Sequence, residues 1–510
     1  MKIEIIRREI IKPSTPTPND FKKFNLSLLN QLAPPVYTSL LLFYPRNNND
    51  HLTTYQIHQQ LKKSVSKTLT RFFPLAGRIE SSFSIECHDY GAHYTEARIH
   101  YTTLFSFLQQ PLDLEKIQLF LPIESNSPKA VSMPLLLVQL TSFECGGVAL
   151  GMCMSHKLAD AAMMFMFVRD WAAITLGNPP EQLPVINFNA ASYFPVKDPA
   201  SFQLPALIFK RAKCVTKRYL FDAKKIASLK AKASSVSVQK PTRTEAITAL
   251  IWRCAMNASS RLNKGVAKHS VMHHFVNLRR IVEPPISENT LGSLVLYFST
   301  HADQSKVELQ DLAAEFNKGI QEFRGREAKR IGGDEAVKVV YEKRKERREL
   351  MNKDDTNLFS CTSLCNFNFY EHADFGLGKP IWMTVDSGAS LNNNIILSNM
   401  REGYGVEAWV TLSEKEMAIF EADPELLSFA SSNPSVLIRH GIAVATIVIL
   451  AGATMAAITG SGDRSKTLRS TLLIRDFIIV VVEVSYNCLM SVFAYSIKCS
   501  NVLDVTADEK

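Results

Sequence analysis

The chain has 510 residues, of which 46% are hydrophobic and 21% are charged. These proportions are typical of a globular protein and exclude a disordered chain, a collagen-like repeat and a coiled coil. Its 58 lysines and arginines outnumber its 49 aspartates and glutamates by a margin that is mild for this length, so we expect no nucleic-acid partner.

Nine cysteines are scattered along the chain, and none of them form a Cys-x-x-Cys pair. An odd number without metal-ligand spacing predicts neither a zinc site nor a disulfide framework, and it favours a reducing compartment. The first twenty residues are charged and carry prolines, so they lack the apolar core of a signal peptide. We therefore expect a cytoplasmic protein with no metal.

The first zone, residues 1–205, begins with a predicted strand at 2–11 and continues with helical spacing over 64–73. Two apolar runs at 135–143 and 148–154 flank a glycine turn and predict a hairpin of buried strands, which a helix over about 158–176 follows. Prolines then punctuate residues 179–213, and we interpret this stretch as a crossover between two domains.

The second zone, residues 214–434, mixes strands with helices and shows no regular alternation between them. This mixture predicts an α/β fold of the layered α+β type. The strands are expected at 214–221, 272–278, 395–398 and 405–412, and the helices at 223–233, 244–256, 307–323 and 414–427.

The third zone, residues 435–510, is an apolar extension. Its segment 441–460 has no charged residue and is long enough to span a bilayer, and a second apolar run at 477–497 contains one charge, Glu483. A basic loop lies between the two runs, so the segment 441–497 could form a membrane hairpin and anchor the protein. Buried helix or strand is the second interpretation, and a segment foreign to the natural folded product is the third.

One histidine stands where a predicted strand ends and a helix begins. His156 is followed four residues later by Asp160, a spacing that would place both on one face of a helix. The ordinary pKa of histidine is near neutrality, so His156 could remove a proton from an alcohol and return it later. From the spacing alone we favour the structural interpretation, a capped helix with a satisfied core histidine.

A second segment combines an acid, an aromatic residue and two glycines in Asp374-Phe375-Gly376-Leu377-Gly378. Such a composition predicts a tight loop. It is not a phosphate-binding loop, because the first glycine of that motif and the Ser or Thr after its lysine are missing. From the residues alone we interpret it as a structural turn.

Together and in this order, the two segments resemble the marks of the BAHD acyltransferase family, which are His-x-x-x-Asp near the chain middle and Asp-Phe-Gly-Trp-Gly near the end. The resemblance covers about residues 1–434 and is most similar to the vinorine synthase branch, whose members usually acetylate polycyclic alkaloid or terpenoid alcohols. Further matches are Phe73-Pro74-Leu75-Ala76-Gly77-Arg78, Thr244-Glu245-Ala246 through Trp252, and Val276-Asn277-Leu278-Arg279.

The resemblance implies two similar α/β domains of the CoA-dependent acyltransferase type with a solvent channel between them, and His156 as the base in that channel. The first domain is expected at 1–205 and carries the histidine motif, and the second at 214–434 with the Asp-Phe-Gly-Leu-Gly loop. The resemblance also implies that Asp160 pairs with Arg279 to hold the motif. Asp374 is carried over as a second catalytic residue, although in the family it is mainly structural, and Gly376 and Gly378 shape its loop.

Two positions depart from the family pattern. Leu377 stands where the family has tryptophan, and Gly292-Ser293 stands where Gly-Asn is common. We expect neither change to touch proton transfer.

The resulting prediction is a monomeric acyl-CoA-dependent O-acyltransferase with no tightly bound cofactor. Acetyl-CoA would be its co-substrate and a hydroxyl of a polycyclic plant metabolite its acceptor. The residues that bind CoA are not predicted. The alternative is a catalytically silent family member that acts as a binding or regulatory protein.

Overall fold

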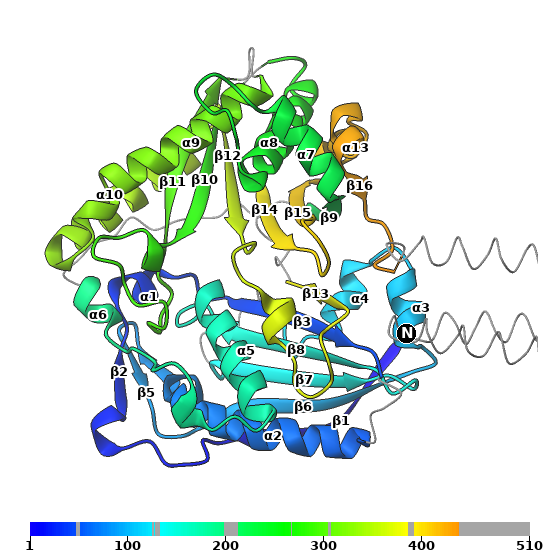
Figure 1. Cartoon of the computed structure of the whole chain (residues 1–510). Coiled ribbons are helices and arrows are strands. Elements are labelled where there is room, and N and C mark those ends of the chain that lie inside the picture. Colours follow the sequence, from blue (N-terminus) through cyan, green and yellow to red (C-terminus); the bar gives the residue numbers. More distant parts are fainter. Residues whose placement is uncertain are drawn as a thin grey trace, which may run out of the picture.

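Two mixed β-sheets, each covered by helices, organise the chain (Figure 1). The computed structural model describes residues 1–46, 52–124, 127, 133–197, 213–266, 268–303, 308–385 and 392–437. This architecture confirms the predicted mixed α/β fold.

The first sheet has six strands in the order β1-β6-β7-β8-β3-β13. Its pairs are antiparallel except for β6 and β7, which run parallel. The strands are β1 (Lys2–Ile11), β6 (Ala92–His100), β7 (Leu136–Ser142), β8 (Val148–Ser155), β3 (Tyr37–Tyr44) and β13 (Trp382–Thr384). The predicted hairpin is therefore β7 and β8. All eight residues of β8 are buried, because hydrophobic clusters cover both faces of the sheet at this strand.

The second sheet has seven strands in the order β11-β10-β12-β14-β15-β9-β16. Strand β12 runs parallel to both of its neighbours, and the other pairs are antiparallel. The strands are β11 (Val295–Asp303), β10 (His269–Asn277), β12 (Thr356–Ser363), β14 (Asn394–Asn399), β15 (Val406–Ser413), β9 (Cys214–Phe221) and β16 (Ser431–Ser432). A small third sheet contains β2 (Lys23–Asn25), β5 (Ser84–Glu86) and β4 (Arg78–Ser81).

The helices divide between the two large sheets. Those of the first half are α1 (Leu28–Leu32), α2 (Thr54–Arg71), α3 (Leu104–Gln109), α4 (Leu114–Gln118), α5 (Ala161–Thr175) and α6 (Ala190–Tyr193). Those of the second half are α7 (Ala223–Lys232), α8 (Arg243–Leu262), α9 (Leu309–Gly325), α10 (Gly333–Met351), α11 (Phe369–His372), α12 (Glu414–Phe420) and α13 (Pro424–Phe429). The predicted helix over 414–427 is thus two helices, because Asp423 caps a new helix whose first residue, Pro424, lacks an N–H.

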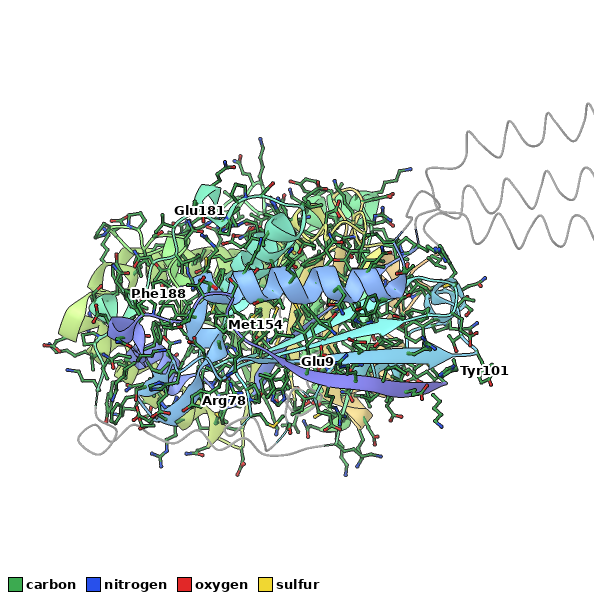
Figure 2. All side chains as sticks on the ribbon, turned by 90° about the horizontal axis from the view of Figure 1, so that it is seen from below. Glu9, Arg78, Tyr101, Met154, Glu181 and Phe188 are labelled. Carbon is green, nitrogen blue, oxygen red and sulfur yellow. The ribbon has the colours of Figure 1, made fainter. Side chains whose placement is uncertain are left out.

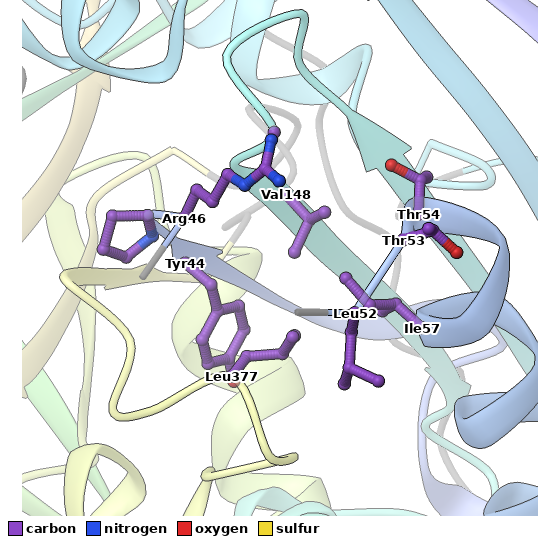
Figure 3. A pocket seen from close by; sticks show the side chains of 10 residues that line it. Tyr44, Arg46, Leu52, Thr53, Thr54, Ile57, Val148 and Leu377 are labelled. Carbon is purple, nitrogen blue, oxygen red and sulfur yellow. The ribbon is translucent and has the colours of Figure 1, made fainter. Parts of the chain in front are cut away.

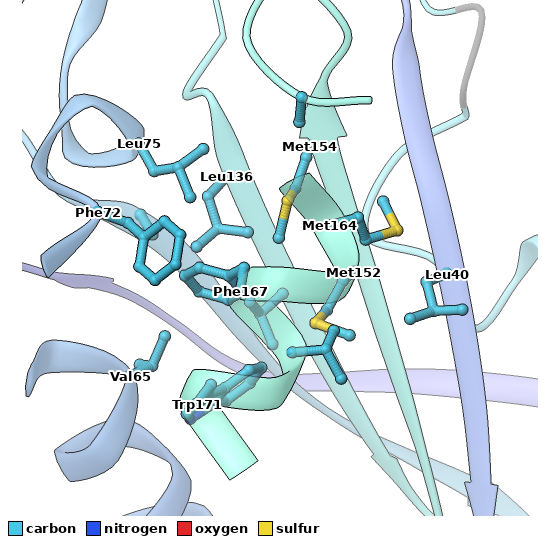
Figure 4. Close-up of a cluster of buried hydrophobic side chains, with 14 of the residues drawn as sticks. Leu40, Val65, Phe72, Leu75, Leu136, Met152, Met154, Met164, Phe167 and Trp171 are labelled. Carbon is cyan, nitrogen blue, oxygen red and sulfur yellow. The ribbon is translucent and has the colours of Figure 1, made fainter. Parts of the chain in front are cut away.

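Helix α5 lies against the first sheet and is apolar around most of its circumference, because the sheet, α2 and α11 surround it. Figure 4 shows its Phe167 and Trp171 over Met152 and Met154 of β8, with Val65 of α2 on the other side. Each such side chain stabilises the fold by about 1.5–3 kcal/mol when it is fully buried. This packing fixes the start of α5 relative to the end of β8.

Side chains fill the space between the layers when the molecule is viewed from below (Figure 2). Met154 lies inside the body, whereas Tyr101 projects from the end of the first sheet with 95% of its surface exposed.

The two halves are not consecutive along the chain. Residues 369–385 leave the second half, and their strand β13 pairs with β3 of the first sheet. Phe375 packs on Trp171 with 4.8 Å between ring centroids, and the Tyr44 hydroxyl donates to the carbonyl of Ala373 at 2.7 Å. The expected boundaries therefore need a correction, because the Asp-Phe-Gly-Leu-Gly loop belongs to the core of the first half. Burial of its apolar side chains there accounts for the crossing.

The apolar extension lies outside the described residues beyond Leu437. Within the ranges given above, no helix combines the length and the apolar character that crossing a membrane requires.

Candidate active site

His156 is the first residue after β8, on the turn that leads to α5. Its backbone N–H donates to the carbonyl of Val36 at 2.8 Å, so the turn is tied to the chain that enters β3. His156, taken as a whole residue, is partly exposed. A central strand and a short turn thus hold the imidazole at one end of the first sheet.

The imidazole contacts a loop of the second half. Nδ1 of His156 lies 3.3 Å from Oγ of Ser293. Burial lowers the pKa of His156 from its usual value, and the ring's own backbone carbonyl and the carboxylate of Asp160 oppose this effect. The neutral, proton-accepting form of the ring is therefore favoured at neutral pH.

Asp160 caps α5 instead of sitting one turn inside it. Its Oδ1 accepts from the N–H of Met163 at 2.8 Å, and its Oδ2 accepts from Nη1 of Arg279 at 2.7 Å and from the N–H of Leu294 at 2.9 Å. The expectation that His156 and Asp160 share a helix face is wrong, because the helix begins only at Ala161. The carboxylate points to the second half, and the implied pair with Arg279 is present.

Arg279 follows β10 in a short 3₁₀ turn, Leu278–Arg280, and its side chain is fully buried. The guanidinium also donates to two backbone carbonyls, to Thr290 at 2.9 and 3.0 Å and to Gly292 at 2.7 Å. A buried charge of this kind is tolerated because its hydrogen-bond donors are used and an acid neutralises it. The pair therefore joins the start of α5 to the loop 290–294 of the other half.

The loop 290–294 carries the site residue that the sequence did not reveal. Gly292 has a φ of +141°, which favours glycine, and a Cβ there would lie 3.1 Å from Oδ1 of Asn30. Ser293 follows it, is 4% exposed and reaches His156. The position that departs from the family's Gly-Asn therefore lies in contact with the histidine of the motif. The only signal in the sequence was its departure from the family's Gly-Asn.

Asp374 lies apart from His156, in the loop between α11 and β13. Its Oδ1 accepts from the N–H of Gly376 at 2.9 Å and of Gly378 at 3.0 Å, and both glycines have a positive φ, +79° and +76°. The carboxylate therefore closes its own loop.

Asp374 and His156 lie near opposite ends of the first sheet. The loop packs on Tyr44, which pairs with Val148 at the start of β8, and Asp374 adds to the effect of burial in raising the pKa of Tyr44. Ser155 ends β8 seven residues after Val148, which is roughly 23 Å along the strand at about 3.3 Å per residue, and His156 comes next. This geometry does not bring Asp374 to the reacting atoms.

Leu377, at the family's tryptophan position, is 7% exposed and borders a pocket of about 250 Å³ (Figure 3). Tyr44, Arg46, Ile57 and Val148 lie around the same space. The departure at Leu377 therefore concerns packing at the end of the sheet that is remote from His156.

Metal-ligating side chains do not gather anywhere in the described ranges, where no group of three or more His, Cys, Asp or Glu could hold an ion.

Comparisons with known proteins show which family the chain resembles over most of its length. A family profile described as "Transferase family" matches residues 1–427. The chain is 36% identical over 447 residues to BAHD acyltransferase BIA1 from Arabidopsis thaliana, which covers 86% of this chain and 99% of that protein. It is 32% identical over 460 residues to limonoid 7-O-acetyltransferase from Citrus sinensis, with 85% and 99% covered.

A solved structure is also similar. Vinorine synthase matches with a TM-score of 0.74 and 32% identity, over 85% of this chain and 99% of its own. Both the sequence and the fold are therefore shared with acyltransferases across nearly their whole length. The chain belongs to the BAHD acyltransferase family.

Proposed function

We propose that this enzyme transfers an acetyl group from acetyl-CoA to a hydroxyl of a polycyclic plant metabolite, a terpenoid or an alkaloid, with His156 as general base. The observation that carries the proposal is the partly exposed His156 at the end of β8, between the two halves of the molecule. The limonoid acetyltransferase among the relatives supports the acetyl donor and the polycyclic acceptor.

The reaction is a direct transfer in a ternary complex. Nε2 of His156 takes the proton of the acceptor hydroxyl while the oxygen attacks the thioester carbonyl carbon. The C–S bond then breaks, and the CoA sulfur takes the proton from His156 as it leaves. No covalent enzyme intermediate is required, and a general base of this kind contributes about 10²–10⁴-fold in rate.

The ring can act at Nε2 because Nδ1 is occupied. Nδ1 of His156 lies 3.3 Å from Oγ of Ser293, and a hydrogen bond of the ring to its own backbone carbonyl raises the pKa of His156. A proton on Nδ1 leaves the lone pair on Nε2 free. The contact at Nδ1 therefore supports Nε2 as the nitrogen that takes the proton from the acceptor hydroxyl.

The pH dependence has a defined sign. A base is active when it is unprotonated, and burial lowers the pKa of His156. We therefore expect kcat/KM to stay level through neutral pH and to fall only below the usual histidine value of about 6.5.

The test uses purified full-length enzyme, acetyl-CoA and a panel of polycyclic alcohols, with products identified by mass spectrometry. His156→Ala should lower kcat by at least about 10²-fold without a change in melting temperature. His100→Ala is the matched control, because His100 ends β6 at the opposite end of the sheet and contacts Glu4. Normal turnover by His156→Ala would refute the base assignment.

The relatives are transferases, so we do not retain the silent binding protein as a second candidate. We propose further that the enzyme works as a monomer in the cytoplasm.

A further inference from the structure

Ser293 is placed by a loop with little freedom. The residue before it gives its carbonyl to Arg279 at 2.7 Å, and the N–H of the residue after it donates to Asp160 at 2.9 Å. The loop is thus held on both sides of Ser293 by the two members of one buried ion pair. Its hydroxyl consequently occupies a fixed position beside Nδ1 of His156.

The imidazole is held from its own side too. The backbone N–H of His156 is bonded to Val36, and the carbonyl of the next residue, Lys157, accepts from Nδ2 of Asn30 at 2.8 Å. The same Asn30 lies against Gly292. Ring and hydroxyl therefore meet through two rigid segments that belong to different halves of the molecule.

We infer that Ser293 is a positioning residue for His156, whose hydroxyl oxygen accepts from Nδ1–H, fixes the ring's tautomer and stabilises the imidazolium that forms during transfer. The inference rests on the proposed function of His156 and adds the residue that supports it. A hydroxyl oxygen can accept this hydrogen bond, and the bond becomes stronger when the ring is charged.

The ring has a second hydrogen-bond acceptor, the backbone carbonyl of His156 itself. Removal of the hydroxyl therefore removes one of two hydrogen-bond acceptors of the ring and leaves the other in place. We expect Ser293→Ala to lower kcat/KM about tenfold, mainly through kcat, because the lost contact is one hydrogen bond to a group that becomes charged.

The acid limb of the pH profile, which is the fall of kcat/KM at low pH, should also shift. Without the hydroxyl the imidazolium is less stable, so the pKa of His156 falls and the limb shifts to lower pH. The charged groups that act on the ring are Asp160, which raises this pKa, and Lys157, which lowers it, and the substitution leaves both in place. A residue with a merely structural role would lower the amount of folded enzyme and leave the limb where it is.

The experiment compares the wild type with three variants as full-length proteins. Ser293→Ala removes the acceptor. Ser293→Asn supplies an amide oxygen in its place and should restore both kcat and the wild-type position of the acid limb. Ser299→Ala is the matched control. Ser299 of β11 lies 3.1 Å from Nδ1 of another histidine, His273 of the neighbouring strand β10. This control should leave the acid limb unchanged.

The titration of the His156 ring is followed in parallel by NMR on ¹⁵N-histidine-labelled protein, with the signal assigned by its absence in His156→Ala. Wild type should show the Nδ1–H tautomer, and Ser293→Ala should show a lower midpoint and a mixture of tautomers. If Ser293→Ala does not fold, Ser293→Cys keeps the shape and replaces the oxygen by a weak acceptor.

The outcomes separate the two proposals. An inactive His156→Ala together with an unchanged limb and an unchanged ring titration in Ser293→Ala overturns the inference and leaves the base assignment intact. An active His156→Ala overturns the proposed function, and the NMR titration still decides whether Ser293 holds the ring.

Discussion

At the scale of single residues, the site depends on one arginine that lies beside a very similar one. Arg279 is fully buried on Asp160, whereas its neighbour Arg280 pairs with Glu288 at the surface, where both side chains are about 60% exposed. Removal of one member of a buried pair leaves a charge without compensation, while an exposed pair contributes little. The two positions therefore form a natural comparison.

Arg279→Ala should lower the free energy of unfolding by about 3–5 kcal/mol. Arg280→Ala should change it by no more than about 0.5 kcal/mol. Urea unfolding followed by tryptophan fluorescence measures both values. An Arg279→Ala enzyme of normal stability that lacks only activity would contradict the structural role that we assign to the pair.

The sequence allowed some of these residues to be predicted and not others. His156 and the pair of Asp160 with Arg279 followed from the family resemblance, and the structure contains the pair. Ser293 was named only as a departure, because its contact with His156 joins positions 137 residues apart. No local spacing reports such a contact, since it arises only when two separate sheets are placed side by side.

At the scale of elements, the region around β8 was the most predictable. Its two apolar strands and the following helix have strong local patterns, and the structure places them at 136–142, 148–155 and 161–175. Strand β13 was not predicted, because three residues are too few to show an alternation. Its partner β3 lies more than 300 residues earlier, so the pairing depends on the whole fold.

The loop that precedes β13 gives a prediction at this scale. Asp374 accepts two backbone N–H groups that turn the loop, and this loop packs on Tyr44, which pairs with the end of β8 that is remote from His156. Asp374→Ala leaves both donors without this acceptor and should cost about 1–3 kcal/mol in stability. The kcat per folded molecule should stay within about twofold of the wild type.

Asp374→Asn is the control for this loop, because its amide oxygen can still accept and only the charge is lost. Thermal unfolding and active-site-normalised turnover distinguish the two variants. A stable Asp374→Ala enzyme without activity would restore the catalytic role that the sequence suggested for Asp374.

At the scale of the whole molecule, the second half returns to the first near the end of the described chain. Nδ2 of Asn433 donates to the carbonyl of Leu112 at 3.0 Å, and Ser435 and Val436 both donate to the carbonyl of Leu108 at 3.1 Å. Together with β13 and the buried ion pair, these bonds connect the two sheets at separate places. The halves should therefore unfold together.

The same contacts show where the chain can be shortened. The family match ends at residue 427, and the last hydrogen bond to the first half is that of Val436, one residue before the described chain ends. A chain that stops after Leu437 keeps both sheets, His156, Ser293 and the ion pair. We expect its kcat to equal that of the full-length enzyme and its melting temperature to differ by no more than about 1 °C, because no described contact is removed.

Flotation with phospholipid vesicles then tests the extension itself. An anchor formed by residues 441–497 would carry the full-length enzyme to the top of a density gradient and leave the shortened enzyme at the bottom. If both stay at the bottom, these residues are no anchor under these conditions. Loss of activity or stability on shortening would contradict the expectation, because it would mean that the extension packs on the catalytic body.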